Sequence, residues 1–139
     1  METVKAIVFD VYGTLFDVHS VFKKCEEFFP SRGSQLSDLW RTKQLEYAFI
    51  QHIIGRYRPF NEITRNSLRF ACEQLGVQLT GEKETELLNA YLTLNPYEEV
   101  PNTLQQLSEN YRLVILSNGT SNMLHPLIEY HHLTPFFSQ

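Results

Sequence analysis

The chain has 139 residues, the size of one ordinary domain, which excludes a large multidomain enzyme. Its 12 basic and 16 acidic side chains give a net charge of −4, so the sequence has no basic surface typical of nucleic-acid binding. It contains two cysteines, Cys25 and Cys72, no long apolar run and no recognisable targeting segment. We therefore expect a soluble cytoplasmic protein without a membrane or nucleic-acid partner.

The first predicted element is a strand at residues 4–9. It is short, contains β-branched residues and is almost continuously apolar, which is typical of a strand covered on both faces in a parallel sheet. The strand leads directly into Asp10, and Gly13 ends it.

The middle of the chain is predicted to be helical, because apolar side chains recur there at helical spacing. No internal repeat or flexible linker interrupts this stretch. The predicted helices are one from Val18 to Phe29 ended by Pro30, one capped by Ser34 and carrying residues 36–54, one capped by Asn61 and ended by Gly76, and one carrying Leu87 to Leu92 that stops near Pro96.

The last third alternates between helix and strand. Its predicted elements are a helix with Pro101 in its first turn, a strand at residues 112–116, a helix that Ser121 or Asn122 caps and that Pro126 either opens late or kinks, and the approach to a third strand at residues 136–139. Only two good strands are present, and an isolated two-stranded sheet is marginal. The protein is therefore either mostly helical or an α/β sheet that lacks some of its strands.

Polar clusters follow both predicted strands, at residues 10–14 and at residues 117–120. In open α/β sheets ligands bind beyond the carboxyl ends of the strands, so two parallel neighbours would bring both clusters into one crevice. A carboxylate there, beside hydroxyl and backbone N–H donors, stays ionised and can act as a nucleophile. The alternative is structural: Asp10 caps a turn, and Asn118 with Gly119 makes a hairpin.

Residues 6–17 (AIVFDVYGTLFD) resemble the first motif of the haloacid dehalogenase superfamily and, more narrowly, that of the L-2-haloacid dehalogenases. Phosphatases of this superfamily carry a second Asp two positions after the nucleophile, where it serves as acid/base and helps to hold magnesium. Tyr12 occupies that position here, which argues against phosphoryl transfer. The resemblance covers essentially the whole chain and continues at residues 16–21 (FDVHSV), 41–47 (RTKQLEY), 56–60 (RYRPF) and 116–119 (LSNG).

The resemblance implies an α/β fold, with a Rossmann-like parallel sheet core at residues 1–16 and 96–139 and a helical cap inserted at residues 17–95. It implies a hydrolase that needs no metal and no cofactor, because the attacking group is already an anion. Asp10 would attack C2 of a small L-2-haloalkanoate, expel halide and form an ester. Water would then cleave the ester to give the (R)-2-hydroxy acid.

The resemblance also implies roles for further residues. Arg41 would bind the leaving halide or the substrate carboxylate, and Asn118 would donate to the halide. Thr14 and Ser117 would orient Asp10 and the substrate carboxylate. The substrate-binding residues around the alkyl group and halogen would be Tyr12, Val11, Leu45, Phe60 and Gly119.

Each of these roles has a plainer alternative. Apart from the resemblance, Arg41 is more typical of a solvated arginine or of a cation–π partner for Trp40, while Tyr12, Leu45 and Phe60 are typical of ordinary core. The cysteines are expected to pack between helices. Three histidines near the end of the chain could suggest a metal site, but a zinc site needs a fourth ligand and the sequence offers none. We expect them to lie on a helix or at its end: His125, His131 and His132.

The chain departs from the family pattern towards its end. Family members carry a lysine after the third strand, which balances the charge on the nucleophile and substrate, and an acidic motif after the fourth, which helps the water that cleaves the ester. No position of this chain matches either motif, and the strand at residues 4–9 would have an unpaired edge. We therefore expect the chain to be marginally stable alone, a homodimer completed by another molecule, or a fragment of a longer protein.

Three functions are compatible with these observations. The first is a 2-haloacid dehalogenase that uses Asp10, Arg41 and residues 117–118. The second is an inactive or single-turnover relative that alkylates Asp10 and stalls at the ester. The third is a phosphatase of the same superfamily, which Tyr12 disfavours.

Overall fold

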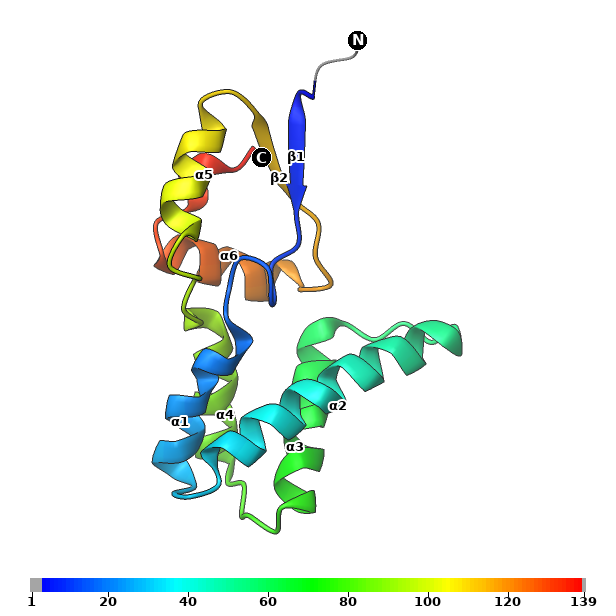
Figure 1. Cartoon of the computed structure of the whole chain (residues 1–139). Coiled ribbons are helices and arrows are strands. Elements are labelled where there is room, and N and C mark those ends of the chain that lie inside the picture. Colours follow the sequence, from blue (N-terminus) through cyan, green and yellow to red (C-terminus); the bar gives the residue numbers. More distant parts are fainter. Residues whose placement is uncertain (1–3, 139) are drawn as a thin grey trace.

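The computed structural model describes residues 4–138 and has two groups of elements that meet at a shared core (Figure 1). Residues 17–95 form only helices and are called the helical region below; residues 4–16 and 96–138 contain both strands and are called the sheet region. The chain crosses from one region to the other twice, after Phe16 and before Pro96. The fold is α/β, as predicted.

Two parallel strands form the sheet. Strand β1 (Ala6–Phe9) pairs with β2 (Arg112–Ile115), with Phe9 opposite Ile115, and the backbone N–H of Leu116 donates to the carbonyl of Phe9 over 2.9 Å. The carboxyl ends of both strands therefore meet at one edge of the sheet. The hairpin alternative for Asn118 and Gly119 is wrong, because β2 is followed by a helix rather than by an antiparallel strand.

Helices α5 (Val100–Ser108) and α6 (Ser121–Tyr130) belong to the sheet region. Pro101 lies in the first turn of α5, as predicted. In α6 the expected cap at Ser121 or Asn122 is wrong: Thr120 is the N-cap, because its extended backbone lets its carbonyl accept the first N–H groups of the helix. Pro126 lies inside the helix and does not delay its start.

A third strand begins beside β2. After the 3₁₀ turn η3 (Thr134–Phe136), Phe137 forms a parallel bridge with Leu113, and the N–H of Ser138 donates to the Leu113 carbonyl over 2.9 Å. Leu113 also pairs with Ile7 of β1, so the new segment lies on the other edge of β2. This confirms the predicted approach to a third strand as far as Ser138, and Gln139 lies outside the described residues.

Four α-helices and two 3₁₀ turns make up the helical region. They are η1 (Val18–Val21), α1 (Phe22–Phe28), α2 (Gly33–Ile53), α3 (Phe60–Gln74), α4 (Gly81–Ala90) and η2 (Tyr91–Thr93). Helix α2 packs against both α1 and α3 (Figure 1). Gly76 follows α3 with a φ of +64°, and the N–H of Val77 bonds back to the carbonyl of Cys72, so the predicted glycine stop is confirmed.

Two predicted helix caps are wrong. Helix α2 starts at Gly33 rather than after Ser34, because the carboxylate of Glu26, in α1, accepts the backbone N–H groups of Ser31 and Gly33 over 2.6 and 2.8 Å. Helix α3 starts at Phe60 rather than after Asn61. The preceding Pro59 sets that start, with a φ of −61°, and no side chain caps the helix.

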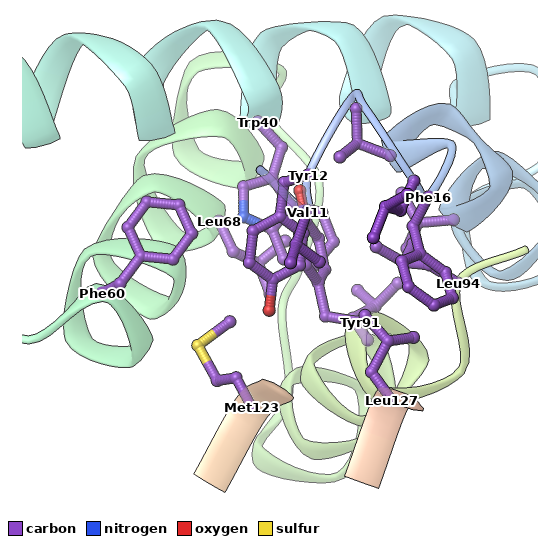
Figure 2. Close-up of a cluster of buried hydrophobic side chains, with 14 of the residues drawn as sticks. Val11, Tyr12, Phe16, Trp40, Phe60, Leu68, Tyr91, Leu94, Met123 and Leu127 are labelled. Carbon is purple, nitrogen blue, oxygen red and sulfur yellow. The ribbon is translucent and has the colours of Figure 1, made fainter. Parts of the chain in front are cut away.

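One continuous buried cluster joins the two regions (Figure 2). The loop after β1 contributes Val11, Tyr12 and Phe16, which meet Trp40 of α2 and Tyr91 of η2. Helix α6 adds to the same cluster from the sheet region, through Met123 and Leu127. The loop that carries Asp10 is therefore anchored by its buried neighbours.

The sheet itself is poorly covered. Within residues 4–138, β1 pairs with β2 alone, and the side chains of Val8 and Leu116 are 57% and 73% exposed. A groove of about 950 Å³, lined mainly by apolar side chains, runs along β2, α6 and the segment after η3. The predicted exposed edge and apolar face of the first strand are confirmed. Within residues 4–138 no helix is long and apolar enough to cross a membrane.

Candidate active site

A tight turn follows β1 and shapes the candidate site. The carbonyl of Val11 accepts the backbone N–H groups of Thr14, Leu15 and Phe16 over 3.2, 3.0 and 3.1 Å. Gly13 has a φ of +88°, a left-handed conformation that a side chain would strain. The turn folds the chain back so that the Thr14 hydroxyl donates to a carboxylate oxygen of Asp10 over 3.2 Å.

Asp10 is exposed at the carboxyl end of β1. Among residues 4–138 it forms no ion pair, and its recorded side-chain hydrogen bond is the one from Thr14. A carboxylate in this state keeps a lone pair available for a ligand. The turn that carries Asp10 is tied to the second connection between the two regions by two backbone hydrogen bonds. Asp17 N–H donates to the Asn95 carbonyl over 2.8 Å, and Tyr97 N–H donates to the Leu15 carbonyl over 3.1 Å.

Tyr12 forms the buried wall of the site. Its ring packs against Phe60, with centroids 5.6 Å apart, and against Tyr91, with centroids 6.2 Å apart. Burial raises the pKa of the Tyr12 phenol, the Arg41 charge lowers it, and the Asp10 charge raises it further. The hydroxyl is buried and has no hydrogen-bond partner among the described residues. Because its pKa is raised, the phenol stays neutral although the charges of Arg41 and Asp10 lie near it.

Arg41 reaches the same turn from α2. One guanidinium nitrogen, Nη2, donates to the backbone carbonyl of Tyr12 over 3.3 Å, and Nη1 donates to Oε1 of Gln44 over 2.7 Å. The side chain is half-buried. No cation–π contact of Arg41 is recorded within residues 4–138, and Trp40 instead donates its indole N–H to the Thr64 carbonyl over 2.8 Å. Within residues 4–138 the cation–π alternative for Arg41 is therefore wrong, and protein acceptors, as well as solvent, hold its half-buried guanidinium.

The loop after β2 closes the other side. The hydroxyl of Ser117 accepts the N–H of Gly119 over 3.1 Å, and Asn118 is exposed at the tip. A Cβ added to Gly119 would lie 2.8 Å from both a Tyr12 ring carbon and the Leu124 side chain. Only glycine lets this loop approach the Tyr12 ring so closely.

The structure brings most of the predicted site residues to this one edge of the sheet. Phe60 and Gly119 each lie against the Tyr12 ring, and Val11, next to Tyr12 in the chain, is fully buried. Leu45 is different: it is 49% exposed on α2 and lies outside the buried cluster. The plainer alternative, ordinary core, therefore fits Tyr12 and Phe60 but not Leu45.

Sequence reasoning gave no role to two buried polar residues of the site. Gln44 and Thr64 are both fully or almost fully buried, and Gln44 Nε2 donates to Thr64 Oγ1 over 2.7 Å. The available signal was spacing, since Gln44 lies three positions after Arg41 and so shares its helix face.

The histidines and cysteines have structural positions. His125 lies on α6, and His131 caps its end, with Nε2 2.7 Å from the Leu94 carbonyl; His132 follows it, exposed. Both cysteines are buried and free, one on α1 and one on α3. These positions confirm the predictions of helix decoration and helix packing. Among residues 4–138 no group of three or more His, Cys, Asp and Glu residues is arranged to hold a metal ion.

Comparison with known proteins gives a consistent result. A family model described as haloacid dehalogenase-like hydrolase matches residues 4–139. The chain is 44% identical over 131 residues to the (S)-2-haloacid dehalogenase of Pseudomonas sp. (strain YL), which covers 94% of this chain and 56% of that protein. It is 40% identical over 140 residues to the (S)-2-haloacid dehalogenase of Pseudomonas putida, covering 62% of that protein.

Solved structures agree. The chain is similar to the L-2-haloacid dehalogenase from Xanthobacter autotrophicus, with a TM-score of 0.92 and 38% identity, over 98% of this chain and 55% of that one. A second structure of the Xanthobacter enzyme has chloropropionic acid covalently bound. The chain thus spans somewhat more than half the length of the relatives it matches.

Proposed function

The chain belongs to the haloacid dehalogenase-like hydrolases, and from that membership we propose that it attacks a small (S)-2-haloalkanoate through Asp10. A carboxylate oxygen forms a bond to C2 while the carbon–halogen bond breaks, and the halide leaves with the bonding electron pair. The product is an ester of Asp10 with inverted C2. Water then cleaves the ester, restoring Asp10 and releasing the (R)-2-hydroxy acid and a proton.

One observation carries this proposal. Asp10 is exposed, is held by the Thr14 hydroxyl at 3.2 Å and is unpaired among residues 4–138, while the Arg41 guanidinium is anchored on the carbonyl two residues further along. A fixed, permanently charged donor beside a free carboxylate suits a reaction in which an anion leaves as the nucleophile attacks.

The remaining predicted residues complete the proposal. Arg41 and Asn118 would hold the halide or the substrate carboxylate, and Thr14 and Ser117 would orient Asp10 and the substrate. The apolar wall would contact the alkyl group and the halogen, through Tyr12, Val11, Leu45, Phe60 and Gly119. We also propose that the helical region corresponds to the cap of the family and the sheet region to its core.

The identity of residue 12 favours carbon–halogen over phosphoryl chemistry. The phosphatase alternative needs an ionised carboxylate at that position. Burial raises the pKa of the Tyr12 phenol, so the group is neutral at physiological pH and supplies neither a base nor an anionic ligand. Release of inorganic phosphate from a phosphomonoester in magnesium-containing buffer would revive that alternative.

The test is incubation of the chain with (S)-2-chloropropionate, followed by halide release and intact mass. We expect chloride release from the (S) isomer, none from the (R) isomer and none from Asp10→Asn. The Asp10→Asn side chain is nearly isosteric and exposed, so the variant should keep its circular dichroism spectrum and melting temperature. Folded wild-type chain that gives neither chloride nor an adduct contradicts the proposal.

A second candidate function, a single turnover, is favoured by the missing counter-charge. No lysine or arginine of residues 4–138 forms an ion pair with Asp10. If the ester is not hydrolysed, intact mass shows one stably bound carboxyethyl group per chain and chloride release stops at one equivalent. Continuing release without a stable adduct supports full turnover instead.

We further propose a homodimer, supported by an apolar surface at the end of α2. Large apolar side chains are exposed there and in the following loop: Leu45, Phe49, Ile50, Ile53, Ile54 and Tyr57. Monodisperse monomer by size-exclusion chromatography with light scattering would contradict this. The expected location is the cytoplasm, which the two buried free thiols support, since free cysteines are typical of a reducing compartment.

A further inference from the structure

A buried chain of polar groups runs from α3 to Arg41. Thr64 Oγ1 donates to the backbone carbonyl of Phe60 over 2.7 Å, and Gln44 Nε2 donates to Thr64 Oγ1 over 2.7 Å. Gln44 Oε1 then accepts from Arg41 Nη1, again over 2.7 Å. Gln44 is fully buried and Thr64 is almost so, which is uncommon for polar side chains away from functional sites.

The available donors and acceptors fix which group donates in each of these hydrogen bonds. The Thr64 hydroxyl has one proton, and the Phe60 carbonyl takes it, so the oxygen can only accept from Gln44. Gln44 must therefore turn its NH₂ group to Thr64, which leaves its amide oxygen facing Arg41. A neutral amide thus presents an acceptor to the guanidinium and leaves the charge of Arg41 intact.

These hydrogen bonds connect Arg41 to the first residue of α3, which also packs against the Tyr12 ring. Phe60 begins α3, its carbonyl ends the polar chain, and its ring packs against Tyr12. The Tyr12 carbonyl is the second acceptor for Arg41, through Nη2. Both terminal nitrogens are therefore fixed in direction, and within residues 4–138 no further hydrogen bond occupies the other N–H groups of Arg41, which can meet an anion.

We propose that Gln44 and Thr64 are positioning residues that hold the Arg41 guanidinium at the anion-binding geometry of the site. The inference rests on the proposed function, since it concerns where the leaving halide or substrate carboxylate binds. A glutamate in place of Gln44 would hold Arg41 equally well but would neutralise it. The amide holds the guanidinium without that loss.

The first experiment reads the position of Arg41 without any reaction. Two hydrogen-bonded terminal nitrogens rotate slowly, so ¹⁵N side-chain NMR of the wild-type chain should resolve separate Nη1 and Nη2 signals for Arg41. In Gln44→Leu these signals should merge, and in Thr64→Val they should broaden. The matched control is Ser67→Ala, which removes another buried hydroxyl from α3 that bonds only to backbone carbonyls. Separate signals that persist in folded Gln44→Leu overturn the inference.

The second experiment measures the rate of Asp10 ester formation from (S)-2-chloropropionate by intact mass. A displaced catalytic group costs up to about 100-fold in rate, so we expect Gln44→Leu to slow ester formation by about 10- to 100-fold and Thr64→Val by less. Thr64→Ser, which keeps the hydroxyl, should restore the rate, and Ser67→Ala should change it less than about twofold. A purely structural role predicts no such rescue.

The outcomes separate the inference from the function on which it rests. Folded wild-type chain that gives neither ester nor chloride refutes the proposed function, and the NMR comparison still decides whether Gln44 orders Arg41. Ester formation in wild type at the same rate as in folded Gln44→Leu refutes the positioning role alone. Gln44→Glu adds a check on charge: we expect resolved Arg41 signals together with slow ester formation.

Discussion

The helical and sheet regions differ in how completely they cover their apolar side chains. Trp40, Leu68 and Leu87 lie on three different helices of the helical region, and all are fully buried. In the sheet region Val8, in the middle of β1, is more than half exposed. Helices satisfy their backbone hydrogen bonds internally and bury one face against a neighbour in sequence, whereas a strand needs partners on both edges.

The comparison also locates the candidate site. Asp10 and Thr14 belong to the sheet region, Arg41 and Gln44 belong to the helical region, and the Tyr12 ring lies between them. The well-packed region therefore supplies the fixed positive charge, and the open region supplies the carboxylate that we propose as the nucleophile. The following changes test this contrast, from the largest expected effect to the smallest.

Trp40→Ala should have the largest effect on stability. The side chain is fully buried, packs against Tyr91 with ring centroids 4.7 Å apart and donates to the Thr64 carbonyl. Its removal should lower the free energy of unfolding by about 3–5 kcal/mol. Urea unfolding followed by far-UV circular dichroism measures this. A loss below about 1 kcal/mol would contradict the close packing assigned to the helical region.

Gly119→Ala tests how closely the loop after β2 packs against the Tyr12 ring, the buried side chain through which the sheet region meets the helical region. The added methyl group would lie 2.8 Å from the Tyr12 ring and from Leu124, so overpacking should cost about 1–3 kcal/mol and displace the ring. The matched control is Gly81→Ala at the start of α4, where a Cβ meets nothing within 4 Å. That substitution should be neutral or slightly stabilising. Equal stability of the two variants would show that the Gly119 loop yields easily.

The thiols of the helical region make its stability sensitive to alkaline pH. Burial raises the pKa of Cys25 from 9.0 to about 12 and that of Cys72 from 9.0 to about 11. Because the folded-state values lie above the unfolded ones, the stabilisation is complete below pH 9 and is lost as pH rises towards 11–12. Burial raises the pKa of Tyr12 and Tyr91 as well, in the same direction.

Two measurements test this prediction: thiol labelling reports whether folding shields the cysteines, and unfolding at several pH values reports the loss of stability. At pH 8 both cysteines should react with a disulfide reagent only when the helical region opens, so labelling should be slow in buffer and fast in urea. Free energies of unfolding measured between pH 8 and pH 10.5 should fall with pH. The double variant Cys25→Ala/Cys72→Ala should show a shallower fall. Rapid labelling of folded chain at pH 8 would mean that the helical region is not closed.

Much of the fold was predictable because its signals are local. The apolar run before Asp10, the left-handed Gly76 and the proline in the first turn of α5 each act on a few neighbouring residues. The failed cap of α2 was not local. The carboxylate that replaces Ser34 as the cap of α2 belongs to Glu26, on the preceding helix, and only the folded α1–α2 corner brings it there.

The candidate site divides in the same way. Thr14 lies four residues after Asp10 on the same turn, so the short motif that contains both residues was enough to predict their contact. Gln44 and Thr64 are 20 positions apart, and glutamine and threonine are usually exposed. Their hydrogen bond therefore could not be predicted without knowing how α2 packs against α3. The role of Leu45 in the pocket, which the family resemblance implies, stays a prediction, since its side chain is 49% exposed on α2 and outside the buried cluster.

Val8→Thr should have the smallest effect and tests the sheet region most directly. Its side chain is 57% exposed and the substitute is also β-branched, so an isolated chain should change by less than about 0.5 kcal/mol. Urea unfolding at two protein concentrations measures this, with Val8→Ala as the companion variant. A loss above about 1.5 kcal/mol that grows with protein concentration would mean that another chain covers β1 in solution. In that case the contrast between the two regions belongs to the single chain and disappears in the assembly.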